Sequence, residues 1–296
     1  MAANPVKTWS TPVRVEEKRP IPCALCGTQA LRPALNCEGF SYSRCVYCGL
    51  VQMNPQPFPE EIWARYNAAT ENGPCPGNCD SSNYLDYELA NEEAFLKLQI
   101  LALTDAGFWE LKTGKQGKVL DIGCATGSLL TLLREQGWET AGVEISRPQA
   151  EYGINKRGLQ IHCRPLEDIK FPGNYFDAVL ASHLIEHLND PRGFVKEACR
   201  ILSPEGRFYV TTPNIAGFQA RLFRGRWRSA IFDHLYLFSE KTLGRMLKEN
   251  GFEIEKTATW GGLAAGIAPN PIKRIFDRAA KRFGFGDVMI MRARKT

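Results

Sequence analysis

Between Lys118 and Thr259 the chain alternates strand-like apolar segments with segments of helical periodicity, and this alternation restricts the possible folds more than any other feature. Strands are expected at residues 118–122, 139–143, 159–163, 175–181, 206–211 and 252–259. Helices are expected at residues 127–136, 147–156, 193–202 and 240–250. Such alternation predicts an α/β fold with a mostly parallel sheet covered by helices on both faces. A last strand-like stretch at 287–294 is typical of an antiparallel edge.

Length and composition allow this fold and exclude others. The 296 residues suffice for one large α/β domain and a small accessory module. No run of about eighteen apolar residues predicts a transmembrane helix, and the N-terminus lacks the apolar segment of a secretory signal. We therefore expect a cytoplasmic protein. The net charge of +5 is concentrated in residues 271–296 and in a cluster at Arg221, Arg224, Arg226 and Arg228. Such patches are typical of a solvated face or of a surface for an anionic substrate, nucleic acid or membrane.

One strand-to-helix junction has the composition of a ligand site. The strand at 118–122 runs through Asp121 into a turn of small residues, 123–127, that opens the first helix. Small residues let a ligand approach the backbone, and the N–H groups of a helix N-terminus attract anions. Of the three glycines in a dinucleotide motif, only Gly123 is present, so a ligand with a carboxylate and an ammonium fits better. Glu144 ends the next strand, where a carboxylate can accept hydrogen bonds from both ribose hydroxyls.

These residues resemble the first motif and the following acidic site of the class I S-adenosylmethionine-dependent methyltransferases. Segments 176–179, 186–191 and 202–206 resemble further motifs of that family, so that the resemblance covers residues 117–296. Ala125 and Glu205 depart from it, because each stands where the family frequently has glycine. The resemblance implies a Rossmann-like, seven-stranded, mostly parallel sheet with an antiparallel edge strand, and S-adenosylmethionine as the cofactor.

The resemblance also implies which residues bind the cofactor. The loop should hold the methionine part, Glu144 the ribose, and the residues after the third strand the adenine. The expected cofactor-binding residues are Asp121, Gly123, Ala125, Gly127, Glu144, Leu166 and Glu167. Asp177, at the fourth strand, is instead interpreted as structural.

Three polar residues just past the fourth strand are the candidate catalytic residues: His183, Glu186 and His187. A general base assists methyl transfer to a hydroxyl, and strand-end loops face the cofactor crevice. His183 comes first and is expected nearest the transferred methyl group. Similar positions in quinone-pathway relatives help to bind a divalent cation, so a metal-assisted route stays open. His187 is equally well explained as a residue that packs against or caps the next helix.

Two Cys-x-x-Cys pairs near the N-terminus predict a zinc ribbon. Cys23 and Cys26 are followed after eighteen residues by Cys45 and Cys48, and a glycine follows each pair. This spacing is a strong zinc signature, and four thiolates leave no open coordination position, so a structural Zn²⁺ is expected. Cys37, Cys75 and Cys79 are interpreted as free thiols.

The chain is thus divided into a flexible arm (1–18), a zinc ribbon (19–57), a helical linker or lid (58–107) and a methyltransferase domain (108–296). The resemblance implies transfer to a small-molecule acceptor, such as a sugar, glycan precursor or quinone-like ring. A zinc-ribbon RNA methyltransferase is one alternative, although its second ligand pair usually contains a histidine. A non-enzymatic zinc-ribbon adaptor with a degenerate cofactor fold is another, against which the intact Asp121 and Glu144 argue. The methylated atom and the oligomeric state stay open.

Two further segments bear on the acceptor. Residues 218–227, rich in aromatic side chains and arginine, are interpreted as a lid over an anionic acceptor or as ordinary surface. Residues 271–285 predict a basic helix with one apolar stripe. Two interpretations of the stripe are open: it packs onto the fold, or it lies on an anionic membrane. The helix lies between the last two strands, so both its ends are tied to the sheet, which favours packing.

Overall fold

The computed structural model describes residues 20–59, 61, 81–111, 117–262 and 270–296. The expected arm at 1–18, Cys75 and Cys79 lie outside these residues. The described residues form a sheet of seven strands and a sheet of four strands.

The seven-stranded sheet has the predicted α/β topology. Its strands are β4 (Lys118–Ile122), β5 (Glu139–Val143), β6 (Ile161–His162), β7 (Phe176–Ser182), β8 (Leu202–Pro213), β10 (Phe252–Trp260) and β11 (Val288–Lys295). Their order is β10-β11-β8-β7-β4-β5-β6. Strands β6, β5, β4, β7 and β8 are parallel, and β11 runs antiparallel to both β8 and β10. The predicted mostly parallel sheet with an antiparallel edge is confirmed.

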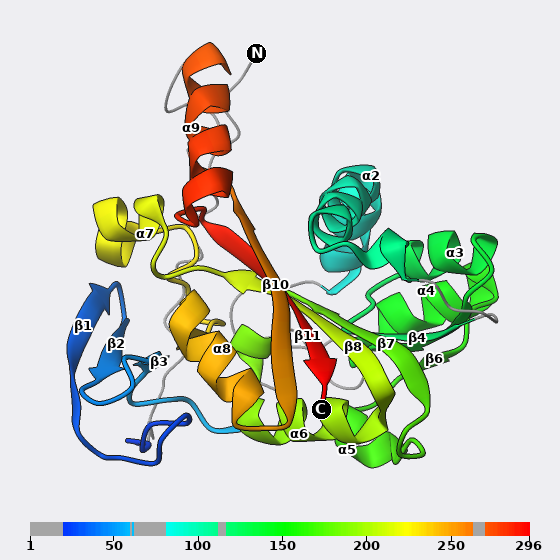
Figure 1. The fold of residues 1–296 in the computed structure, drawn as a ribbon, viewed down its shortest axis with the longest axis horizontal. Helices are drawn as coiled ribbons and strands as arrows, with labels where there is room; N and C mark the ends of the chain where they lie inside the picture. Colours follow the sequence, from blue (N-terminus) through cyan, green and yellow to red (C-terminus); the bar gives the residue numbers. More distant parts are fainter. Residues whose placement is uncertain (1–19, 60, 62–80, 112–116, 263–269) are drawn as a thin grey trace.

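Helices cover both faces of this sheet (Figure 1). The described α-helices are α2 (Ser81–Asp105), α3 (Ser128–Glu135), α4 (Arg147–Arg157), α5 (Leu166–Ile169), α6 (Pro191–Ile201), α7 (Phe218–Phe223), α8 (Glu240–Lys248) and α9 (Asn270–Phe283), of which α7 and α9 lie away from the faces of this sheet. Successive strand residues point to opposite faces. Val119 and Leu180 pack in the core that α2 and α3 cover, whereas Leu120 packs in the core under α6 and α8. No described helix is both long and apolar enough to cross a membrane.

Two strands differ in extent from the prediction. The expected strand at 159–163 keeps only the two residues of β6, because Leu159 lies outside the ladder and packs beside Ile161 under α3 and α4. The expected strand at 206–211 begins earlier, because Leu202 already pairs with Phe176 of β7. Both differences concern strand ends, where hydrophobic pattern says little about pairing.

The four-stranded sheet joins the ribbon to the rest of the chain. Its order is β1 (Leu31–Cys37), β2 (Phe40–Cys45), β3 (Val51–Met53) and β9 (Tyr236–Leu237). Strand β9 belongs to the segment expected in the methyltransferase domain, and it pairs antiparallel with β3. The buried Tyr42 hydroxyl adds hydrogen bonds of 2.8 Å to the carbonyls of Ile231 and His234. The ribbon is therefore attached to residues 231–237 by strand pairing with β9 and by the hydrogen bonds of Tyr42.

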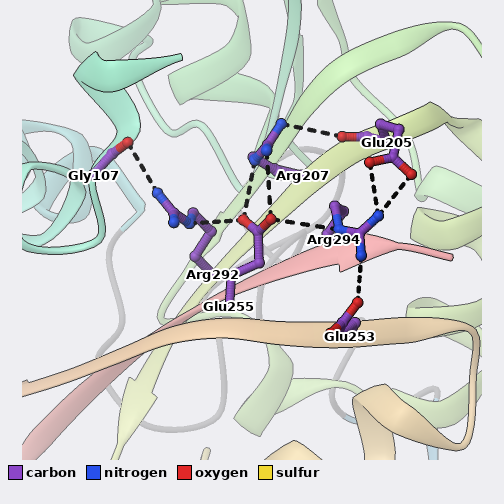
Figure 2. Close-up of polar contacts among 7 residues, drawn as sticks. All are labelled: Gly107, Glu205, Arg207, Glu253, Glu255, Arg292 and Arg294. Atoms are coloured by element: carbon purple, nitrogen blue, oxygen red, sulfur yellow. Dashed lines mark hydrogen bonds and ion pairs between the residues drawn. The ribbon is translucent and has the colours of Figure 1, made fainter.

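An ion-pair network ties β8, β11 and β10 together at the antiparallel edge (Figure 2). Arg294 of β11 donates to both oxygens of Glu205, at 2.7 Å each, and also bonds Glu253. Glu255 of β10 accepts from Arg207 of β8 at 3.1 Å and lies 2.9 Å from Arg292. Because these pairs bridge three strands, they stabilise the lateral arrangement of β8, β11 and β10 in the sheet.

Helix α9 projects from the body at the end of the sheet (Figure 1). Ala280 is buried, but Ile275 and Phe283 keep 64% and 70% of their surface exposed. The Ile272 side chain lies outside the described part. Lys281 forms an ion pair with Asp105 of α2 at 2.6 Å. The apolar stripe expected to pack onto the fold is therefore only partly packed.

Candidate functional site

The small-residue loop after β4 bends through three left-handed backbone positions. Gly123, Ala125 and Gly127 have φ angles of 76°, 49° and 77°. The N–H groups of Gly123 and Cys124 donate to the Val143 carbonyl of β5 at 2.8 and 3.1 Å, which fixes the loop at the strand ends. The geometry explains why small residues stand here, since a larger side chain would combine backbone strain with a loss of space.

Two buried carboxylates face this loop. Asp121 is 1% exposed and its Oδ2 has no hydrogen-bond partner among the described residues. Glu144 accepts from the Ala125 N–H at 2.9 Å and from the Ser146 N–H at 2.7 Å. Burial and the neighbouring Glu144 raise the pKa of Asp121 to about 7. A buried carboxylate oxygen without a hydrogen-bond partner lies beside a loop whose small side chains leave the backbone accessible. This combination fits a ligand that carries hydrogen-bond donors and positive charge.

Helix α2 adds two carboxylates that the sequence analysis did not identify. Glu92 accepts from the Thr126 hydroxyl at 2.8 Å and pairs with Arg157 at 2.5 Å. Glu88 accepts from the Gln149 side chain at 2.7 Å. The spacing of four residues places Glu88 and Glu92 on one helix face. This spacing was the only feature of the sequence that could have indicated that both side chains point toward the same neighbour. Helix α2 therefore lies against the loop and α4.

The remaining expected cofactor residues differ in environment. Leu166 is buried at the start of α5, and Glu167 beside it is exposed. Asp177 accepts from the Lys118 N–H at 2.8 Å, which anchors β4 to β7 and supports its structural interpretation.

His183 and Glu186 meet at the end of β7. His183 has a left-handed φ of 52°, a conformation that is uncommon for non-glycine residues. Its Nδ1 lies 3.3 Å from Oε1 of the fully buried Glu186, and Oε2 of Glu186 accepts from the Thr212 hydroxyl at 2.9 Å. Although burial alone would raise the pKa of Glu186, the bond to His183 and the nearby histidines lower it well below its usual range. A buried carboxylate thus lies beside a half-exposed imidazole.

His187 lies in a second cluster, with Glu186 and His234. One ligand atom from each of these three residues lies within 4.8 Å of the others. His187 Nδ1 bonds the Asp233 carbonyl and His234 Nδ1 bonds the Ser229 carbonyl, both at 2.8 Å. Burial and His187 lower the pKa of His234 to about 4, so its imidazole is neutral at physiological pH. The sequence analysis did not identify His234, because it lies some fifty residues beyond the end of the fourth strand in the sequence.

The four ribbon cysteines converge as expected. Their sulfur atoms lie within 4.8 Å of one another. Gly27 and Gly49 have φ angles of 73° and 83°, and their N–H groups close each knuckle by donating to the carbonyls of Cys23 and Cys45.

The surroundings of these thiols fit a metal ion. Burial raises the pKa values of Cys23 and Cys48, whereas at Cys45 hydrogen bonds, first among them from the Cys48 N–H, outweigh burial and lower the pKa to about 6. A shallow pocket beside Cys45 and Cys48 is lined by the cations Arg32, Arg44 and Lys241. A divalent ion bound by four thiolates keeps a net negative charge, which these cations would balance.

The segment interpreted as a lid is anchored at one end. Trp227 is 2% exposed and its Nε1 donates to Asp287 at 2.6 Å, and Arg228 pairs with the other oxygen of Asp287 at 2.7 Å. Trp227 is thus a core residue, whereas Leu222 of α7 is exposed.

Comparisons with known proteins agree with this geometry. Residues 93–257, more than half of the chain, match a family model described as a methyltransferase domain. A ubiquinone biosynthesis O-methyltransferase of Coxiella burnetii is 26% identical over 174 residues, which are 56% of this chain and 73% of that protein. The fold is similar to a SAM-dependent methyltransferase of Thermotoga maritima, with a TM-score of 0.54 and 22% identity over 73% of this chain and 96% of the other. A SAM-dependent methyltransferase of Archaeoglobus fulgidus is similar with a TM-score of 0.52 and 21% sequence identity, over 71% of this chain and 99% of the other.

Proposed function

The chain belongs to the methyltransferase-domain family, and from this premise we propose that it transfers a methyl group from S-adenosylmethionine to a hydroxyl of a small-molecule acceptor. The methyltransferase class and the cofactor follow from the family. The hydroxyl is supported by one observation, the contact between His183 and the buried Glu186 at the end of β7. A sugar, a glycan precursor or a quinone-like ring is the proposed acceptor class, and the similarity to an O-methyltransferase of ubiquinone biosynthesis favours the ring.

The cofactor is proposed to lie along the carboxyl ends of β4, β5 and β6. Asp121, the loop 123–127 and Glu144 would hold its amino-acid and ribose parts, and Leu166 with Glu167 its adenine. When bound, it supplies an electrophilic methyl group. The left-handed loop and the orphaned Oδ2 of Asp121 support this placement.

In the proposed mechanism His183 acts as the general base. Nδ1 of His183 lies 3.3 Å from Oε1 of Glu186, and a proton on Nδ1 would leave Nε2 to accept the proton of the acceptor hydroxyl. Glu186 stabilises the imidazolium that forms and holds the ring in place, as a buried carboxylate does for a catalytic histidine. Proximity and orientation of acceptor and methyl group supply most of the rate enhancement in such a displacement.

Calorimetry and an activity screen test the function. Wild type should bind S-adenosylmethionine, and Glu144→Ala should weaken binding by about 1–3 kcal/mol because charge-assisted hydrogen bonds are lost. Metabolite extracts incubated with a donor that carries a labelled methyl group should reveal the acceptor. His183→Asn should reduce turnover about 100-fold or more with cofactor affinity intact, whereas the control Lys256→Asn, at an exposed position of β10 at the other edge of the sheet, should retain both. Absence of cofactor binding in wild type would contradict the function.

The cluster of Glu186, His187 and His234 supports a competing mechanism with a divalent cation. In that case added Mg²⁺ or Mn²⁺ should raise turnover, and His234→Ala should remove the response. Turnover that is independent of added divalent ions leaves His183 as the base.

We further propose one structural Zn²⁺ on Cys23, Cys26, Cys45 and Cys48. Metal analysis of wild type should give one equivalent of zinc, and Cys45→Ser should lose it. Cys37→Ser is the matched control, because Cys37 lies in the same sheet but outside the cluster. Zinc retained by Cys45→Ser would contradict the assignment.

A further inference from the structure

The pocket beside the second zinc knuckle gathers three cations, and no carboxylate lines it among the described residues. Its lining includes Arg32 of β1, Arg44 of β2 and Lys241 of α8, together with the knuckle residues Val46 and Tyr47. The volume of the pocket is about 320 Å³, which lies within the range of sites for small ligands. None of the three cations forms an ion pair within the described part of the chain.

The positions of these cations in their strands and helix are unfavourable without an anion. Arg32 and Arg44 are directly opposite each other in the antiparallel pair of β1 and β2, so both side chains leave the sheet on the same face. Like charges opposite each other destabilise a strand pair. Lys241 lies in the first turn of α8, where the helix dipole disfavours a positive charge. An anionic ligand in the pocket would relieve all three costs.

The zinc centre proposed above does not use all of this positive charge. Four thiolates around one Zn²⁺ leave two negative charges in excess. Arg44 faces that centre, because its Nη1 donates to the Gly49 carbonyl of the second knuckle at 3.3 Å. On the first knuckle, Arg192 donates to a backbone carbonyl. Arg32 and Lys241 are exposed and are therefore available to a ligand from solvent.

We propose that this pocket binds the phosphate groups of a nucleotide, with the ring of Tyr47 against its base. Arg32 offers a planar pair of N–H donors that matches two phosphate oxygens, and Lys241 offers a point charge. Tyr47 keeps 76% of its surface exposed, and nucleobases stack on exposed aromatic rings that lie beside cations. The inference is independent of the function proposed above, because the pocket shares no residue with the cofactor loop or with the end of β7.

The test is calorimetry of the purified chain with uridine diphosphate and with inorganic pyrophosphate. S-adenosylhomocysteine is present in excess, so that the proposed cofactor site is filled. Arg32→Gln and Lys241→Gln each remove one charge, and Tyr47→Ala removes the ring but leaves the cations. Lys248→Gln is the matched control, because Lys248 is exposed in the last turn of the same helix as Lys241. Zinc content and melting temperature, measured for each variant, separate a loss of binding from a loss of fold.

Wild type should bind both probes, uridine diphosphate more tightly, and both less tightly at high salt. Arg32→Gln and Lys241→Gln should each weaken both probes about tenfold, because a charge-assisted hydrogen bond is lost, whereas Lys248→Gln should change neither. Tyr47→Ala should weaken uridine diphosphate alone. Wild type that binds neither probe, or wild-type affinity in both Arg32→Gln and Lys241→Gln, overturns the phosphate site. Undiminished affinity of Tyr47→Ala for uridine diphosphate overturns the contact with the base.

Discussion

Two residues that stand where the methyltransferase family frequently has glycine both adopt a left-handed backbone. Ala125 has a φ of 49° and Glu205 a φ of 62°. A side chain in this region costs roughly 1–2 kcal/mol. At Glu205 the bidentate contact with Arg294 offsets part of this cost (Figure 2). At Ala125 the small side chain limits it. The departures from the motif therefore leave the backbone geometry of the family in place.

This predicts a difference between two substitutions at one position. Glu205→Ala keeps the strained backbone and loses the ion pair, whereas Glu205→Gly loses the ion pair and relieves the strain. The glycine variant should be more stable than the alanine variant by about 1 kcal/mol in free energy of unfolding. Chemical denaturation of both variants measures the difference. Equal stability would show that the left-handed backbone carries no cost at this turn.

The raised pKa values of Glu88 and Asp121 predict a pH dependence. Both are about 7 in the folded protein and lie above the ordinary values of 4.5 and 3.8. The folded state thus retains protons that the unfolded state releases, so this contribution to stability is lost as the pH rises through about 7. The melting temperature of the cofactor-free protein should fall between about pH 6 and pH 8, while stabilisation by S-adenosylmethionine should grow.

Asp121→Asn is the control for this dependence. It removes one of the two titrating groups, so the fall in melting temperature should become smaller. A cofactor-free melting temperature that rises across the same interval contradicts the assignment of protonated carboxylates to the site.

At the scale of elements, the pairing of β3 with β9 and the Tyr42 hydroxyl are among the contacts that join the ribbon to the segment 231–237. Tyr42→Phe removes the donor to the carbonyls of Ile231 and His234, and a buried carbonyl left without its donor costs about 1–3 kcal/mol. The variant should be less stable by that amount. Tyr47→Phe, at an exposed position of the ribbon, is the control. Equal effects of the two substitutions would argue against this coupling.

Apart from the short helices α5 and α7, sequence periodicity predicted the helices and the longer strands between Lys118 and Lys295 to within a few residues, because most of them have a clear apolar face. It did not predict that β9 joins the ribbon sheet, since a strand of two residues has no pattern of its own. The candidate site divides in the same way. Asp121 and Glu144 follow from local motifs, whereas Glu88 and His234 reach the site only through packing of distant segments, which a local motif does not encode.

At the scale of the whole molecule, the exposed face of α9 bears on where the protein works. Ile275 and Phe283 are exposed, and Arg278 and Arg282 form no ion pair among the described residues. An apolar face flanked by unpaired cations matches an anionic membrane surface better than it matches water. Of the two sequence interpretations, the packed helix and the membrane-bound helix, the second is therefore the one we predict.

Flotation with vesicles decides the matter. The protein should float with vesicles that contain phosphatidylglycerol, less so at high salt, and remain unbound with phosphatidylcholine alone. Arg278→Glu/Arg282→Glu should abolish flotation, and because both side chains are exposed, stability should change by no more than about 0.5 kcal/mol. Lys256→Glu, on β10, is the control for net charge. If wild type stays unbound with anionic vesicles, α9 serves a protein contact or the fold itself, and an acceptor dissolved in water is favoured over a lipid-linked one.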